Sequence, residues 1–152
     1  MTSLPSRDEI LEAFVGHLIR KPDPVLYAAM ELAGLHKARL RAAAEGAGTD
    51  EIDHRRTILA HSIDCWVAVE VPHARQGALL HTETVGAVID RLARFCVAAH
   101  EVLMRSTSEV ERHHAWQRLA ELAVAYGDMV FEVSAGIRRV PDLGGVDADA
   151  TE

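Results

Sequence analysis

Signals that start and stop helices divide this chain into five segments, and they constrain its fold more strongly than any other feature. Ser6 and Glu9 have the spacing of a capping box, in which side chains bond the free backbone N–H groups at the start of a helix. Asp23 followed by Pro24 is a second start signal, because proline fits the first position of a helix. Glycines and prolines, which interrupt helices, separate the segments. The pattern predicts an all-α protein.

One predicted helix is short, over about residues 7–15, and four are long, over about 24–45, 49–71, 82–105 and 108–139. Thr82 is the predicted cap of the fourth helix, and Pro141 stops the fifth. Residues 73–80 fit either a loop or a helical turn. Long helices with short connections are typical of an up-and-down four-helix bundle, here with a short extra N-terminal helix.

Charge and hydropathy narrow the possible partners. The 152 residues contain 16 Lys and Arg against 23 Asp and Glu, a net charge of −7, which disfavours binding to nucleic acid. No apolar run approaches the ~20 residues of a membrane span, and no secretory signal is visible, so we expect a cytoplasmic protein without membrane contact. Residues 142–152 are acidic and contain two adjacent glycines, which predicts a disordered tail after a single domain over 1–141.

Polar residues interrupt the apolar faces of three predicted helices. His36 and Arg39 lie on the apolar face of the second helix, and Arg56 on that of the third. Glu83 and Asp90 follow a strip of small residues on the fourth. Buried polar groups need partners, so these side chains are candidates for one site between the helices.

Gly86 lies between the two carboxylates of the fourth predicted helix. The spacing of Glu83, Gly86 and Asp90 places all three along one side. Glycine inside a helix costs roughly 0.5–1 kcal/mol relative to alanine, so we expect another backbone or a ligand to approach closely there.

These residues suggest a pocket for a small polar or anionic metabolite, with cofactor-free acid–base chemistry of the lyase, isomerase or cyclase type as a possible activity. Guanidinium groups would bind the anion, a carboxylate would be the general base, and an imidazole its acid–base partner. The candidate catalytic residues are Glu83, Asp90, His81 and His36, and the candidate ligand-binding residues are Arg39, Arg56, Arg91 and Gly86.

Two alternatives remain open at this stage. The same residues could form a structural ion network in a non-enzymatic homodimer or adaptor. A metal-dependent bundle enzyme could instead use His36, His81, Glu83 and Asp90 across helices, although no metal-binding motif is present and no metal is predicted. The acids Glu121, Asp128 and Glu132 of the last helix lie opposite its apolar stripe, which predicts a solvated face.

The segment His-Thr-Glu-Thr-Val-Gly-Ala-Val-Ile-Asp-Arg-Leu-Ala over residues 81–93 resembles the central motif of an actinobacterial family of domains of unknown function, numbered four-two-five-four. Segments 31–40, 63–67 and 118–128 are similar to the same family. The resemblance covers about residues 5–141 and implies a compact helical domain without an established activity. The residues that carry it overlap the candidate site: His36, Arg39, His81, Glu83, Gly86, Asp90 and Arg91.

Overall fold

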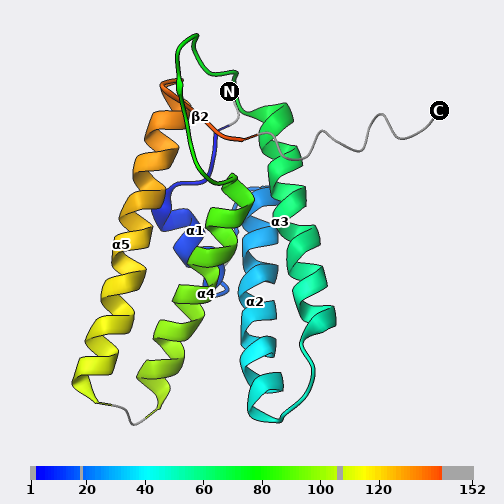
Figure 1. Cartoon of the computed structure of the whole chain (residues 1–152), viewed down its shortest axis with the longest axis vertical. Coiled ribbons are helices and arrows are strands. Elements are labelled where there is room, and N and C mark those ends of the chain that lie inside the picture. The colour runs from blue at the N-terminus through cyan, green and yellow to red at the C-terminus, as the bar shows by residue number, and fades with distance from the viewer. Residues whose placement is uncertain (1–2, 18, 106–107, 142–152) are drawn as a thin grey trace, which may run out of the picture.

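The computed structural model describes residues 3–17, 19–105 and 108–141, which form five helices and one pair of short strands (Figure 1). The elements in chain order are α1 (Arg7–Phe14), α2 (Pro24–Ala44), α3 (Asp50–Glu70), β1 (Leu79–Leu80), α4 (Val85–Met104), α5 (Glu109–Ser134) and β2 (Arg138–Arg139). The four long helices alternate in direction (Figure 1). The prediction of an all-α helical bundle is confirmed.

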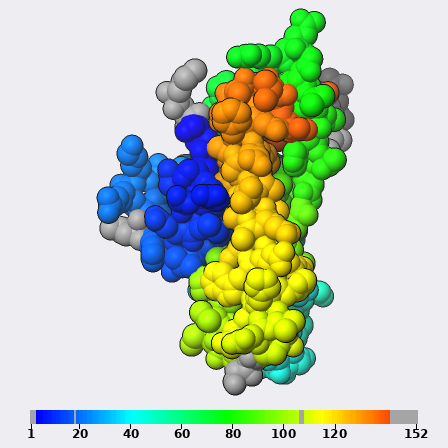
Figure 2. Space-filling view, turned by 90° about the vertical axis from the view of Figure 1, so that its left-hand side faces the viewer, coloured from blue at the N-terminus to red at the C-terminus, as the bar shows by residue number. Residues whose placement is uncertain are grey.

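All five helices contribute to one hydrophobic core, but the long helices do not all pack against one another. Helices α2, α3 and α4 pack against one another, whereas α5 packs on α4 and, within the described residues, makes no packing contact with α2 or α3. Helix α1 contacts α2, α4 and α5, and Figure 2 shows it lying beside α5. Its apolar face is buried through Ile10, Ala13 and Phe14. The short N-terminal helix is therefore part of the core rather than an addition to it.

A buried tyrosine ties the segment before α1 to α5. The Tyr126 side chain is fully buried, and its hydroxyl donates a hydrogen bond of 2.8 Å to the backbone carbonyl of Pro5. Buried hydroxyl groups need such a partner. Burial raises the pKa of Tyr126, so the hydroxyl stays protonated and keeps donating.

Most of the predicted helix starts are confirmed, but one is wrong. The Ser6 hydroxyl accepts from the backbone N–H of Glu9 at 3.2 Å, and the Asp23 carboxylate accepts from that of Val25 at 2.9 Å. Helix α4 is capped by Thr84 and not by Thr82, since the Thr84 hydroxyl accepts from the N–H of Ala87. The backbone of Thr84 is extended, and the N–H of His81 before it donates to the carbonyl of Arg139.

The prediction for the end of α5 is also wrong. The helix ends at Ser134, and Gly136 then adopts a positive φ of 75° that turns the chain out of it. The following residues form β2, which pairs in parallel with β1 so that Leu79 faces Arg138 and Leu80 faces Arg139. Residues 73–80 are thus a loop that ends in a strand. The predicted tail, 142–152, lies outside the described residues.

Within the part of the chain that the structure describes, no helix combines the length and apolarity needed to cross a bilayer.

Candidate functional site

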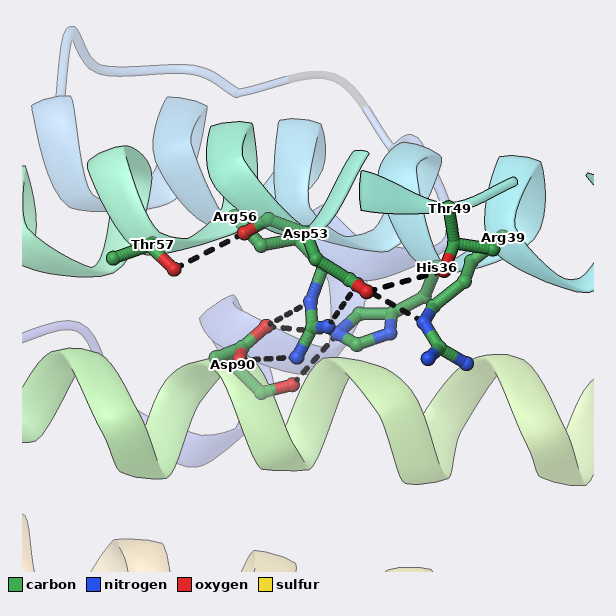
Figure 3. Close-up of polar contacts among 7 residues, drawn as sticks. All are labelled: His36, Arg39, Thr49, Asp53, Arg56, Thr57 and Asp90. Atoms are coloured by element: carbon green, nitrogen blue, oxygen red, sulfur yellow. Dashed lines mark hydrogen bonds and ion pairs between the residues drawn. The ribbon is translucent and has the colours of Figure 1, made fainter. Parts of the chain in front are cut away.

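A network of three side chains joins α2, α3 and α4 (Figure 3). Asp90 of α4 accepts a hydrogen bond of 2.8 Å from His36 Nε2 through Oδ1. The Arg56 guanidinium holds the same carboxylate with two nitrogens, Nε at 3.2 Å from Oδ1 and Nη2 at 2.7 Å from Oδ2. The His36 side chain is only 3% exposed, and those of Arg56 and Asp90 are 21% and 19% exposed. The structure therefore brings together three predicted site residues, one from each helix.

Asp53, which sequence reasoning missed, extends the network toward solvent. Its Oδ1 accepts from Arg56 Nη1 at 2.7 Å and from Arg39 Nε at 3.0 Å, and its Oδ2 accepts from the Thr49 hydroxyl at 3.2 Å (Figure 3). Among the described residues, Arg39 contacts the network through Asp53. The spacing of Asp53 three residues before Arg56 is a signal for an ion pair on one helix face.

The charges of this network favour its ionised form. Burial alone raises the pKa of Asp90, but hydrogen bonds from His36 and Arg56 outweigh it, so that the pKa lies below its ordinary value of 3.8. Hydrogen bonds from Arg39 and then Arg56 likewise lower the pKa of Asp53, and the hydrogen bond to Asp90 raises the pKa of Arg56.

This arrangement suits a structural element better than a site for acid–base chemistry. The two carboxylates, Asp53 and Asp90, balance the two guanidinium groups, Arg39 and Arg56, so that little positive charge is left for an anionic ligand. A carboxylate with a lowered pKa is also a weak base. The geometry therefore gives no support to the predicted role of Asp90 as a general base, and it favours a role in holding α2, α3 and α4 together.

The pKa of Asp90 predicts a pH dependence of stability. Because this pKa is lower in the folded chain, the contribution of Asp90 is complete above about pH 4 and is lost as the pH falls through the lowered value. Urea denaturation between about pH 6 and pH 3 should show a steeper loss of stability for the wild type than for Asp90→Asn. Parallel curves for the two proteins would contradict this assignment.

Three other predicted residues form a separate group before and along the first turns of α4. The Arg91 guanidinium contacts the Glu83 carboxylate, and both side chains are about two-fifths exposed, at 39% and 40%. His81 accepts from the backbone N–H of Glu83 through Nδ1 at 3.1 Å. The eight predicted residues therefore do not form one site. Glu83 and Arg91 make a surface ion pair, which contributes little to stability.

Gly86 marks the close approach of α3 and α4. A Cβ atom at this position would lie 2.1 Å from the carbonyl oxygen of Ala60. The Gly86 N–H donates to Asp64 Oδ1 at 2.7 Å. The neighbour predicted from the glycine is therefore another backbone and not a ligand, and Asp64 is a second polar residue that sequence reasoning missed.

A groove of about 470 Å³ lies between the C-terminal half of α3, the loop that follows it, and β2. Five valines line its wall, from α3, the residue after it, α5 and the residue after β2: Val67, Val69, Val71, Val133 and Val140. Its polar lining includes Asp64, His73, Arg138 and Arg139. None of the eight predicted residues lines the groove. Two of them contact residues that do: the Gly86 N–H donates to Asp64, and the His81 N–H donates to the carbonyl of Arg139 at 2.8 Å. The motif at residues 81–86 therefore supports one wall of the groove.

The described residues contain no assembled metal site of the kind that the metal-dependent alternative requires. There, no three or more His, Cys, Asp and Glu side chains are grouped so that they could hold an ion. His36 and Asp90 belong to the three-helix network, whereas His81 and Glu83 lie before α4. On α5, Glu121 and Asp128 are exposed as predicted, and Glu132 contacts Arg138.

The fold and these contacts define a small all-α bundle with an internal ion network and an open groove. A family model described as "Protein of unknown function (DUF4254)" matches residues 41–141. The chain belongs to this family, which confirms the resemblance over α3 to β2. The matched part includes Arg56, Asp90 and the whole groove lining. No curated protein and no solved structure matches the chain.

Proposed function

We propose that this protein binds a small anionic molecule with an apolar part in the groove between α3 and β2. The observation that carries the proposal is the combination of an apolar wall with Arg139 in one cavity. Within the described residues, the Arg139 guanidinium has no ion-pair partner, whereas that of Arg138 contacts Glu132. A guanidinium binds a carboxylate or a phosphate with two parallel hydrogen bonds, which gives the ligand its anionic class.

The size and the wall of the groove support an amphipathic ligand. Small-molecule sites commonly have volumes of about 300–1,000 Å³ and are lined mainly by apolar side chains with a few polar groups. The groove, at about 470 Å³, lies within this range. Its valines would cover a short hydrocarbon part, and burial of apolar surface contributes about 25 cal/mol per Å².

The proposal keeps a small-molecule function but assigns it to a different place from the predicted one. The network of His36, Arg56 and Asp90 positions α3 against α2 and α4, and α3 provides one side of the groove. We also propose a cytoplasmic location, which is supported by the free thiols of Cys65 and Cys96, because thiols are kept reduced in that compartment.

Calorimetric titration with octanoate, octanol and octylamine tests the proposal. We expect octanoate to bind more tightly than the neutral or cationic ligand, and Arg139→Gln to weaken octanoate about tenfold, corresponding to the loss of one charge-assisted contact. The matched control is Arg55→Gln, which removes an exposed guanidinium of α3 outside the groove. Equal effects of the two substitutions, or no binding of octanoate, would refute the site.

A further inference from the structure

The two cysteines lie in opposite environments. Cys65 is exposed on α3 and lines the groove, and its Sγ lies 3.4 Å from Nε2 of His61, one helical turn earlier. Cys96 is buried on α4, where burial raises the pKa of its thiol to about 11. Only Cys65 therefore combines access to solvent, a neighbouring imidazole and a cavity that could hold a reaction partner.

The contact between Cys65 and His61 has the geometry of an activated nucleophile. The thiolate is the reactive form of cysteine, and an imidazole within hydrogen-bond distance can accept the thiol proton and then stabilise the thiolate. Both side chains lie at the surface of α3, so neither requires a rearrangement of the core to react.

Two guanidinium groups, one imidazole and one carboxylate line the groove around Cys65. His73 comes from the loop after α3, and Arg138 and Arg139 come from β2. The carboxylate of the lining is Asp64, whose Oδ1 accepts from the backbone N–H of Gly86. The Arg138 guanidinium forms an ion pair with the Glu132 carboxylate of α5. The guanidinium of Arg139, which has no ion-pair partner among the described residues, is the group that would attract an anionic reagent.

We propose that Cys65 is a modification site at which a small anionic disulfide forms a mixed disulfide with the protein. The Cys65 thiol gives its proton to His61 Nε2, and the thiolate attacks one sulfur of the disulfide R–S–S–R. A new S–S bond joins Cys65 to one R–S group, the original S–S bond breaks, and the other half leaves as R–S⁻. The disulfide is the oxidant, and His61 returns its proton to solvent.

The rate of reaction with dithiobis(nitrobenzoate), a dianionic aromatic disulfide, tests this assignment. The release of coloured thiolate is followed with Cys96→Ser, which leaves Cys65 as the only thiol, and with Cys65→Ser, which leaves Cys96. We expect Cys65 to react about tenfold faster than the same thiol in the urea-unfolded chain near neutral pH, and His61→Gln to remove most of this advantage. Cys96 should react only when the chain unfolds.

His54→Gln is the matched control, because His54 is an exposed histidine of α3 that makes no contact with Cys65. The proposal is overturned if folded and unfolded Cys65 react at equal rates, or if His54→Gln and His61→Gln have the same effect. Cystamine, a dicationic disulfide, should react with Cys65 more slowly than the dianionic reagent does. This preference for an anionic reagent rests on the proposed groove site, whereas the effect of His61→Gln on the rate does not depend on that site. Octanoate binding by Cys65→Ser then tests the groove without the thiol.

Discussion

Asp90→Asn should lower the free energy of unfolding by about 2–3 kcal/mol, below the cost of breaking a fully buried ion pair, because the Arg56–Asp90 pair is part-buried and Arg56 keeps its contact with Asp53. The substitution keeps the shape of the side chain but leaves the Arg56 guanidinium, only 21% exposed, against a neutral amide. It also weakens the acceptor of His36, whose side chain is almost fully buried. Urea denaturation at neutral pH measures the loss.

The control for this substitution is Asp128→Asn, which removes an exposed carboxylate from α5. Surface substitutions of this kind usually change stability by less than about 0.5 kcal/mol. Similar stabilities for the two variants would show that the network does not hold the three helices together. In that case its residues would have to be explained by a ligand.

Gly86→Ala should destabilise the fold by about 3 kcal/mol, at the upper end of the range for overpacking. The new methyl group would lie 2.1 Å from the backbone oxygen of Ala60, and a helix backbone cannot move away without moving α3 as a whole. The shift would also disturb the hydrogen bond between the Gly86 N–H and Asp64. Thermal and urea denaturation both report this change.

Gly34→Ala provides the opposite result within the same chain. Gly34 lies inside α2, and a Cβ atom built there meets nothing within 4 Å. Alanine is the better helix former, so this variant should gain roughly 0.5–1 kcal/mol. If both glycine variants were stabilised, the close approach of α3 and α4 would be wrong.

The three-helix network could be predicted because helical periodicity shows which side of a helix is buried. His36, Arg56 and Asp90 each fall on an apolar face, and polar groups placed there must find one another. The contacts of Asp53 and Asp64 could not be predicted, because each residue lies at the edge of an apolar face. At such an edge, periodicity does not show whether a side chain points to water or to a neighbouring helix.

The groove could not be predicted, because it depends on the pairing of segments that are distant in the sequence. The two strands have only two residues each, too few for a strand pattern. Pro141 predicts too late an end for α5, because Gly136 already ends the helix through its positive φ. Because α5 ends before them, Arg138 and Arg139 can form β2 and line the edge of the groove.

The parallel pairing of β1 with β2 has a consequence for the order of assembly during synthesis. Parallel strands need a crossover between them, and here α4 and α5 together form it. A nascent chain that has emerged only through α4 already contains every residue of the His36–Arg56–Asp90 network. The groove also needs residues of α5 and β2, which are synthesised later. The ion network can therefore form and organise the bundle before the groove exists.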